Sequence, residues 1–248
     1  MKRIYMDIGN SRIKLAVMTG DRWDVETIIV KKEGINLRSK LPKDPENVLL
    51  VLTSVRKDRL ELVEKEISGF HYTILEKKSI PKELLDYNTI TTLGLDRYLS
   101  CLGAVSKAKK DVIVIDAGSA ITIDYMSQGY IFKGGAIIPG KRVVLEAMIS
   151  SLPELPLPDD NIPEQFPGKS TIDCIRWGVN GSFQSILIDF LNRYQKLTNE
   201  SAAIIVTGGD AEYIVSLISG RWSVISDEYL LFDGMKQFLN LFKPELKS

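Results

Sequence analysis

The four residues Asp116-Ala-Gly-Ser119 combine a carboxylate, a glycine and a hydroxyl in one short stretch. An apolar, β-branched run at 112–115 precedes them and an alternating segment at 120–126 follows, which predicts a turn between two strands. Gly118 has no Cβ atom, so the backbone can approach a ligand closely there. Carboxylate and hydroxyl oxygens together with turn amides suit phosphate groups and their metal ion. We therefore expect nucleotide chemistry at this turn.

The same arrangement occurs near the start of the chain. Asp7, Gly9 and Ser11 follow a short apolar run, and residues 11–18 align with residues 119–126 when one residue is dropped from the turn. A repeat this long exceeds a solenoid unit, which recurs at roughly 20 to 50 residues. It indicates a duplicated domain, and two such turns facing across a cleft would clamp a nucleotide.

The elements that must position the two turns follow one order in both halves. Hydrophobic patterns predict the order βββαβ in the first half and βββαβα in the second, and βββαβ is the order that a ribonuclease H-like domain requires. The fold class expected is therefore α/β, with two duplicated ribonuclease H-like domains at 1–110 and 111–248, each with a mixed sheet and flanking helices, around a nucleotide cleft. Predicted strands lie at 4–8, 11–18, 22–30, 48–52, 72–75, 112–115, 120–126, 129–138 and 202–206, and helices at 56–68, 141–152, 172–190, from 211 and 229–242.

Composition excludes several classes of function. The chain has 248 residues, is 44% hydrophobic, and carries 32 basic and 32 acidic side chains, so it has no basic field for nucleic acid or for an anionic membrane. The first residues show no signal peptide, and no apolar stretch is long enough to span a membrane. We expect a cytoplasmic protein.

Cysteine and histidine offer little chemistry. Cys101 and Cys174 stand far apart without CxxC spacing, and His71 is the one histidine, so thiol–histidine catalysis and His/Cys zinc sites lack partners. We expect both cysteines to be small buried residues on helices and His71 to lie at the surface or at a strand edge.

Asp96 and Arg97 stand side by side in residues 86–105, where apolar spacing predicts a helix that Thr91 or Thr92 would cap. Two interpretations stay open from the pattern alone. Asp96 can complement the helix dipole with Arg97 solvated. Alternatively, Asp96 is a general base beside a guanidinium that anchors an anionic substrate. The apolar positions of this helix are Leu95, Leu99, Leu102 and Val105.

The amino-acid composition changes after the central strands. Five of the ten prolines fall within residues 153–167, which predicts either an ordered excursion or a mobile flap. Ser170 and Thr171 then mark the start of a long helix.

Six short motifs, in order and spacing, resemble type III pantothenate kinases, which belong to the superfamily of acetate and sugar kinases and actin. Each motif alone is weak, whereas six together are specific, and they cover almost the whole chain. They are DIGNSRIK at 7–14, GLDR at 94–97, DAGSAITID at 116–124, GGAIIPG at 134–140, GKST at 168–171 and TGGD at 207–210.

The resemblance implies that ATP, with magnesium, phosphorylates pantothenate to 4'-phosphopantothenate, the first step of coenzyme A biosynthesis. Asp7 would orient a metal-bound water, while Asn10 and Ser11 would hold the γ-phosphate. Lys14 would offset charge, unless it points to solvent from its hairpin. The phosphate loop implied in this way consists of Asp7, Ile8, Gly9, Asn10, Ser11, Arg12, Ile13 and Lys14.

On the acceptor side, the resemblance implies that Asp96 takes the proton from the pantothenate hydroxyl. Pantothenate would contact Tyr87, Thr171 and the GLDR motif, whose residues are Gly94, Leu95, Asp96 and Arg97. Serine stands at residues 11 and 119 where the family more often has threonine, so we expect looser packing with the same contacts.

The second half would complete the nucleotide site. Asp116 corresponds to a ligand of a monovalent cation, potassium or ammonium, and Ser119 to an ATP contact. Gly208 and Gly209 would form the adenosine turn.

The resemblance also implies a homodimer, and the apolar stripe of the helix after Arg97 would serve such an interface. Two alternatives share the phosphate turns: a kinase for another small alcohol, and a nucleotide-binding scaffold or regulatory protein of the actin type. A duplicated binding module without a nucleotide is disfavoured by the two matching turns.

Overall fold

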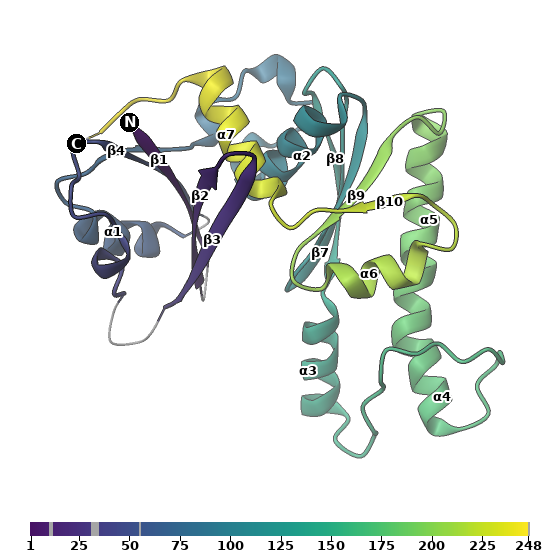
Figure 1. Ribbon diagram of the computed structural model, residues 1–248. Coiled ribbons are helices and arrows are strands. Elements are labelled where there is room, and N and C mark those ends of the chain that lie inside the picture. Colours follow the sequence, from purple (N-terminus) through teal and green to yellow (C-terminus); the bar gives the residue numbers. More distant parts are fainter. Residues whose placement is uncertain (10–11, 31–34, 55, 248) are drawn as a thin grey trace. The chain divides into compact units, whose positions relative to one another are not determined.

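The computed structural model describes residues 1–9, 12–30, 35–54 and 56–247. It divides into two compact units, one formed by Met1–Ser106 together with Tyr229–Ser248 and the other by Lys107–Glu228. Figure 1 shows that each unit is a twisted sheet with flanking helices. The expected α/β class with two mixed sheets is therefore confirmed.

The sheet of the first unit has five strands in the order β3-β2-β1-β4-β5. β1 pairs with β2 in the antiparallel sense and with β4 in the parallel sense, so it occupies the centre of the sheet. β2 pairs with β3 as a hairpin, and β4 pairs with β5 in parallel. The strands are β1 (Lys2–Ile8), β2 (Arg12–Thr19), β3 (Arg22–Ile29), β4 (Val48–Ser54) and β5 (His71–Ile74).

The sheet of the second unit repeats this topology strand for strand. Its order is β10-β9-β6-β7-β8, so that its first strand again lies between an antiparallel and a parallel neighbour. This match confirms the duplication that the two turns predict. The strands are β6 (Val112–Ala117), β7 (Ala120–Met126), β8 (Phe132–Pro139), β9 (Ala203–Thr207) and β10 (Val224–Ser226).

Helices cover both sheets, and apolar side chains fill the space between the layers. In the first unit the apolar core includes Met6, Leu50 and Val63, which are fully buried. In the second unit Ile113, Leu187 and Ile214 are fully buried in the corresponding core. The α-helices are α1 (Lys57–Glu66), α2 (Leu95–Ala108), α3 (Lys141–Ser151), α4 (Thr171–Arg176), α5 (Ser182–Leu197), α6 (Ala211–Ile218) and α7 (Leu230–Phe242), and the π-helical turn η5 (Trp177–Gly181) joins α4 to α5.

The last helix, α7, packs on α2 in the first unit (Figure 1). The two helices approach closely because both carry glycine at the contact: a Cβ atom on Gly103 would lie 2.8 Å from the backbone nitrogen of Gly234. The Nε1 atom of Trp23 in β3 also donates a 2.9 Å hydrogen bond to Asp233 of α7. Residues 229–247 thus pack with the first unit, although the sequence-based division assigned them to the second domain.

This packing corrects the expected role of the apolar stripe on α2. Leu99, Leu102 and Val105 are buried in the first unit, with exposed fractions of 1% or less. Since α7 of the same chain covers α2, that stripe is not available as a surface for a second subunit.

Several local expectations also differ from the structure. α2 begins at Leu95, because Thr91 and Thr92 belong to the separate 3-10 turn η4 (Ile90–Thr92) and neither caps the helix. Cys101 is buried as expected, whereas Cys174 is exposed because α4 buries none of its residues. His71 is exposed on β5, an edge strand, which confirms its expected place. Within the described ranges, the helices are all too short or too polar to span a membrane.

Candidate active site

Asp7 is the penultimate residue of β1, in the centre of the first sheet. In the register of the sheet it lies opposite Lys14 of β2 and Thr53 of β4. The backbone nitrogen of Gly9 donates a 3.0 Å hydrogen bond to the carbonyl of Arg12, which closes the turn between the strands. Asn10 and Ser11, which the resemblance assigns to the γ-phosphate, lie outside the described residues.

The pKa of Asp7 is raised to about 6 from its ordinary value of 3.8. Burial is the main cause, because it penalises the charged carboxylate. The ammonium of Lys14 acts in the opposite direction, and the nearby charge of Asp96 raises the pKa further. The charges of Lys14 and Asp96 therefore both act on the carboxylate of Asp7.

Asp96 lies in the first turn of α2, where its half-buried carboxylate folds back over Gly94. A Cβ atom at position 94 would collide with the Oδ1 atom of Asp96 and would lie 3.6 Å from the Cδ atom of Arg97. Glycine is therefore required at this position if Asp96 is to keep its orientation. Arg97 is only 8% exposed and Leu95 only 7%, so neither side chain is solvated. This burial contradicts the interpretation in which Arg97 is solvated.

The other residues predicted for this half of the site divide into two groups. Ile8 and Ile13 are fully buried in the apolar core, so only their backbone atoms can contact a ligand. Arg12 is exposed at the start of β2. Tyr87 is half-buried in the loop between two 3-10 turns, η3 (Lys82–Leu84) and η4, on the segment that leads to Gly94.

Asp116 occupies in the second sheet the place that Asp7 has in the first. It is the penultimate residue of β6 and lies opposite Thr122 of β7 and Thr207 of β9. The backbone nitrogen of Gly118 donates a 3.0 Å hydrogen bond to the carbonyl of Ala120 and closes a turn that is one residue shorter than the first. The predicted alignment of the two turns is confirmed.

The turn after β9 packs directly on the end of β6. Gly208 has a φ of +95°, a conformation that glycine adopts readily, and a Cβ atom there would lie 2.6 Å from the Oδ1 atom of Asp116. The backbone nitrogen of Asp210 also donates a 3.0 Å hydrogen bond to the carbonyl of Ala117. The structure thus brings Gly208 to the carboxylate of Asp116, whereas a Cβ atom on Gly209 would meet no atom within 4 Å.

Ser119 is exposed in the turn between β6 and β7, and two groups position it. Its carbonyl accepts a 2.9 Å hydrogen bond from the backbone nitrogen of Gly140, and its hydroxyl accepts a 3.0 Å bond from the Nη2 atom of Arg142. Sequence reasoning did not select Arg142, because an arginine two residues into an amphipathic helix has no distinguishing pattern.

Thr122 is a second residue that sequence reasoning missed. Its side chain shares a face of the sheet with that of Asp116, because the two residues lie directly opposite in an antiparallel pair. Its Oγ1 atom is buried and has no hydrogen-bond partner in the parts of the chain that the structure describes. A buried hydroxyl without a partner is costly, so it indicates a place for a bound group.

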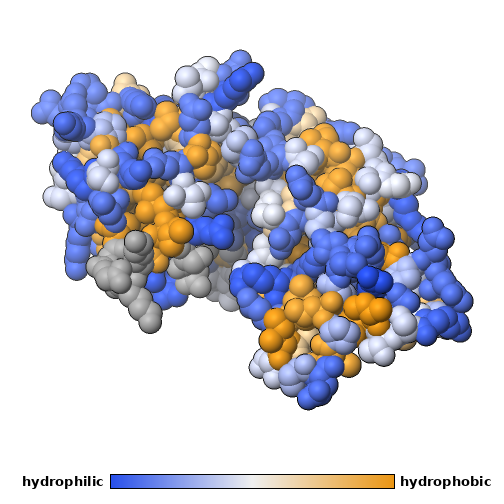
Figure 2. All heavy atoms as spheres, turned by 60° about the horizontal axis from the view of Figure 1, so that its bottom comes forward, coloured by the Kyte–Doolittle hydropathy of each residue, from blue (hydrophilic) through white to orange (hydrophobic). Residues whose placement is uncertain are grey.

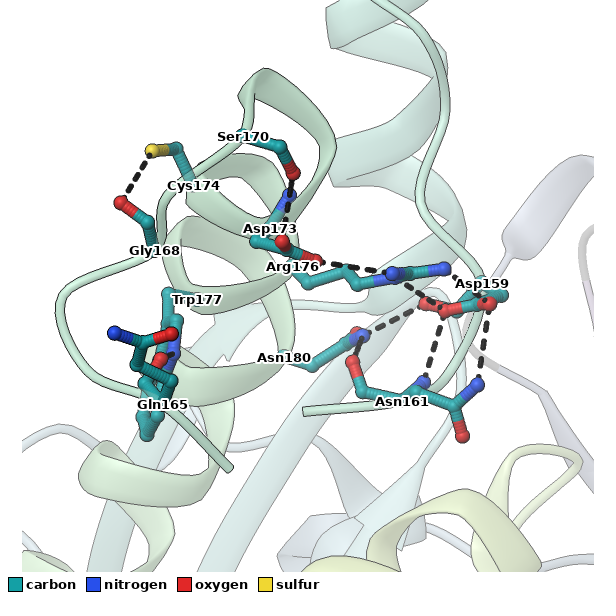
Figure 3. Close-up of polar contacts among 10 residues, drawn as sticks. All are labelled: Asp159, Asn161, Gln165, Gly168, Ser170, Asp173, Cys174, Arg176, Trp177 and Asn180. Carbon is teal, nitrogen blue, oxygen red and sulfur yellow. Dashed lines mark hydrogen bonds and ion pairs between the residues drawn. The ribbon is translucent and has the colours of Figure 1, made fainter. Parts of the chain in front are cut away.

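Thr171 is exposed at the first position of α4, after the N-cap residue Ser170. The hydroxyl of Ser170 accepts a hydrogen bond from the backbone nitrogen of Asp173, which confirms the predicted helix start. Figure 3 shows this end of α4 together with the proline-rich segment that precedes it.

No group of three acidic, cysteine or histidine side chains gathers anywhere in the described part of the chain. A metal would therefore rest on one carboxylate, backbone or hydroxyl oxygens and the phosphates of a nucleotide. Near Asp116 the carbonyl of Ala117 and the hydroxyl of Thr122 supply such oxygens. Hard cations prefer oxygen ligands, so these residues fit a cation.

Comparison with known proteins identifies the family. The sequence profile of the family described as type III pantothenate kinase matches residues 3–191. The chain belongs to this family. Type III pantothenate kinase of Azobacteroides pseudotrichonymphae is 30% identical, over 99% of each chain. Its namesake in Chlorobaculum tepidum is 31% identical, over 98% of this chain and 95% of its own. Such kinases phosphorylate pantothenate with ATP in coenzyme A biosynthesis, and the expected family and activity are confirmed.

Solved structures confirm the fold of this family member. A Campylobacter jejuni protein assigned to the Baf family of transcriptional activators superposes with a TM-score of 0.59 at 24% identity, covering 96% of this chain and 97% of its own. Component A of (R)-2-hydroxyglutaryl-CoA dehydratase from Acidaminococcus fermentans gives 0.54 at 13% identity, over 98% of both chains. At these identities the likeness shows that the fold is shared, and it does not show whether the function is shared.

Replacing Asp7 with asparagine should change how stability depends on pH. Because the pKa of Asp7 is raised to about 6 from 3.8, the folded chain binds more protons than the unfolded chain between these values, and Asp7 lowers stability as the pH rises. Asp7→Asn lacks this ionisation, so its free energy of unfolding relative to the wild type should rise by about 1 to 3 kcal/mol between roughly pH 4 and 6, then stay constant. Urea unfolding at several pH values measures this.

The control is Asp58→Asn, since the hydrogen bond from Arg56 holds the pKa of this exposed carboxylate below its usual value. The free energy of unfolding of Asp58→Asn relative to the wild type should not rise between these pH values. A stability difference between Asp7→Asn and the wild type that is the same at every pH would contradict a raised pKa.

Proposed function

We propose that Asp96 is the general base of a pantothenate kinase in this chain. It would accept the proton of the pantothenate primary hydroxyl as that oxygen attacks the γ-phosphate of ATP. One observation supports the assignment of the base: Asp96 lies close enough to Asp7, the carboxylate of the first phosphate turn, for its charge to raise the pKa of Asp7. Membership of the family identifies the reaction, and the proximity of Asp96 to Asp7 supports Asp96 as its base.

Phosphoryl transfer requires positioning and neutralisation of charge more than covalent chemistry. An alcohol is not ionised at neutral pH, so a carboxylate within hydrogen-bond distance of the hydroxyl is expected to act as the general base. Arg97 and the backbone of residues 94–97 would hold pantothenate beside Asp96, with Tyr87 and Thr171 as further contacts. Magnesium bound to ATP would supply additional positive charge at the phosphates.

Each unit has a turn that would bind part of a nucleotide. Gly9 and Gly118 allow close approach of the backbone to phosphate, and Ser119 adds a hydroxyl. Gly208 and Gly209 would bind the adenosine because no side chain blocks that surface. An ATP-dependent reaction also requires a compartment that contains ATP, so we propose a cytoplasmic location.

Replacing Asp96 with asparagine should lower the rate of pantothenate-dependent ADP release by about 10²- to 10⁴-fold, the usual contribution of a general base. Asparagine is nearly isosteric with aspartate but cannot accept the proton. The affinity for ATP should change little, because Asp96 would contact the acceptor and not the nucleotide. A coupled ADP-release assay and nucleotide titration measure the two quantities.

Asp58→Asn is the matched control, since Asp58 is the acidic residue in the first turn of α1 as Asp96 is in α2. Full activity of Asp96→Asn would remove Asp96 as the base. ATP binding without turnover in the wild type would favour a nucleotide-binding scaffold, and turnover with another alcohol alone would favour a different small-molecule kinase.

We also propose that Asp116 binds a monovalent cation, potassium or ammonium. Support comes from the buried, unpartnered hydroxyl of Thr122 on the same sheet face and from the carbonyl of Ala117 nearby. A cation there would offset the phosphate charge at the second turn.

If this holds, potassium should raise wild-type turnover several-fold over a sodium or choline buffer of equal ionic strength. Asp116→Asn should lose most of that activation, because an amide offers no negative charge to the cation. Initial rates across a potassium titration measure it, with Asp111→Asn as a control carboxylate immediately before the same strand. Equal potassium activation in the wild type and in Asp116→Asn would exclude the site.

We further propose that the chain forms a homodimer through α3 and the segment after it. Aliphatic side chains are exposed there, and Figure 2 shows apolar side chains gathered on one face of the second unit. Large exposed apolar patches mark interaction surfaces. The residues concerned are Val143, Ile149, Leu152, Leu155 and Leu157.

Introducing a charge at Ile149, which is 55% exposed, should weaken the dimer. Ile149→Glu should raise the dissociation constant at least about tenfold in sedimentation equilibrium, since a charge must then be buried at the interface. Leu197→Glu is the control, because Leu197 is also exposed but lies at the far end of α5. A monomeric wild type, or equal dimerisation of both variants, would refute this interface.

A further inference from the structure

The proline-rich segment between α3 and α4 has neither helix nor strand, yet side chains of the following helix hold its backbone (Figure 3). The Nδ2 atom of Asn180 donates hydrogen bonds of 2.7 and 2.9 Å to the carbonyls of Asp159 and Asn161. The Nε1 atom of Trp177 donates a 3.0 Å bond to the carbonyl of Gln165. Of the two predicted states, the structure therefore shows the ordered excursion.

Asn180 is the buried centre of this arrangement. It has no exposed surface, and its Oδ1 atom accepts a 2.9 Å hydrogen bond from the hydroxyl of Tyr213 in α6. All of its side-chain polar atoms are thus used, as burial of an amide requires. It lies in the π-helical turn η5, and such turns occur often at functional sites.

Asp159 and Arg176 join the segment to α4 by a two-pronged ion pair. The Nε and Nη2 atoms of Arg176 donate to the two carboxylate oxygens of Asp159 at 2.9 and 2.7 Å, and Asp159 also caps the backbone of Asn161. The Nη1 atom of Arg176 donates to Asp173 at 3.1 Å. Paired hydrogen bonds of this kind fix geometry more strictly than a single ion pair.

The same chain of contacts ends at the residue before Thr171. Asp173 accepts a 2.6 Å hydrogen bond from the hydroxyl of Ser170, the N-cap of α4. α4 has six residues, none of them fully buried, and its contact with the apolar core is made by the partly buried Ile175 in its second turn, so the first turn is held mainly by polar contacts. A Cβ atom on Gly168 would lie 2.7 Å from the backbone nitrogen of Cys174, so the end of the segment also packs on the α4 backbone. The orientation of Thr171 therefore depends on this polar network.

We propose that Asp159 and Arg176 are positioning residues that hold Thr171 in place for the acceptor substrate, a small hydroxy acid amide. The inference rests on the proposed function, in which Thr171 contacts pantothenate. Neither residue would touch the substrate, and both act through the first turn of α4.

Arg176→Met tests the proposal, because it keeps most of the length of the side chain and removes the guanidinium that donates both hydrogen bonds to Asp159. We expect the KM for pantothenate to rise about tenfold, since a small displacement of a binding group carries a large cost, while the KM for ATP stays within about twofold. Asp159→Asn should show the same selective effect. Arg193→Met is the matched control: its exposed ion pair with Asp189, at 2.7 Å, lies in α5 away from Thr171, and its loss should leave both KM values unchanged.

Combining the substitution with Thr171→Ala separates positioning from general destabilisation. If Arg176 acts through Thr171, the double variant should have the same KM for pantothenate as Thr171→Ala alone. Additive effects, equal rises in both KM values, or an Arg176→Met variant that behaves as Arg193→Met would each overturn the proposal. A wild type without pantothenate-dependent turnover would instead remove the proposed function and this inference with it.

Discussion

In both units the first strand of the repeat pairs with an antiparallel hairpin partner on one side and a parallel strand on the other. This pairing fixes where the chemistry can occur. The penultimate residue of that strand is an aspartate in each case, Asp7 and Asp116, and the parallel neighbour places a buried threonine beside it, Thr53 and Thr207. A glycine amide then closes each turn. Because side chains alternate along a strand, a shift of one residue in register would turn both carboxylates away from their sites.

Burial gives the first turn an unusual electrostatic state. Asp7 has a raised pKa because it is withdrawn from water and lies near a second carboxylate, that of Asp96. Such a pair is unfavourable in an empty site, and a bound cation would reverse the shift. Lys14 offsets part of this cost, which explains why a lysine faces the carboxylate across the hairpin. The proposed binding of a metal-bound phosphate would offset the features that weaken the fold locally.

Much of this arrangement was predictable from the sequence. Both turns, the order of the strands and the start of α4 follow from local patterns of apolar residues, glycines and capping side chains. The position of α7 was not, because its contact with α2 depends on Gly103 and Gly234, which meet only in the folded chain. The strand β10 has three residues and is largely exposed, so it carries no periodic signal.

Other features depend on contacts across long stretches of sequence. Nothing in the pattern around Asn180 indicates a buried amide that binds two carbonyls of the preceding segment and the hydroxyl of Tyr213. The apolar spacing of residues 172–190 predicts one continuous helix, and the π-helical turn within it is not apparent until Trp177 and Gly181 are seen in contact. Thr122 and Arg142 likewise become candidate site residues only when the folded chain places them beside Asp116 and Ser119.

Identification of the reaction product tests the central claim most directly. The purified wild-type protein would be incubated with ATP, magnesium, potassium and pantothenate, and the products separated and weighed by mass spectrometry. The account predicts pantothenate carrying one added phosphoryl group, formed in equal amount to ADP. Release of ADP and inorganic phosphate with pantothenate left unchanged would contradict it.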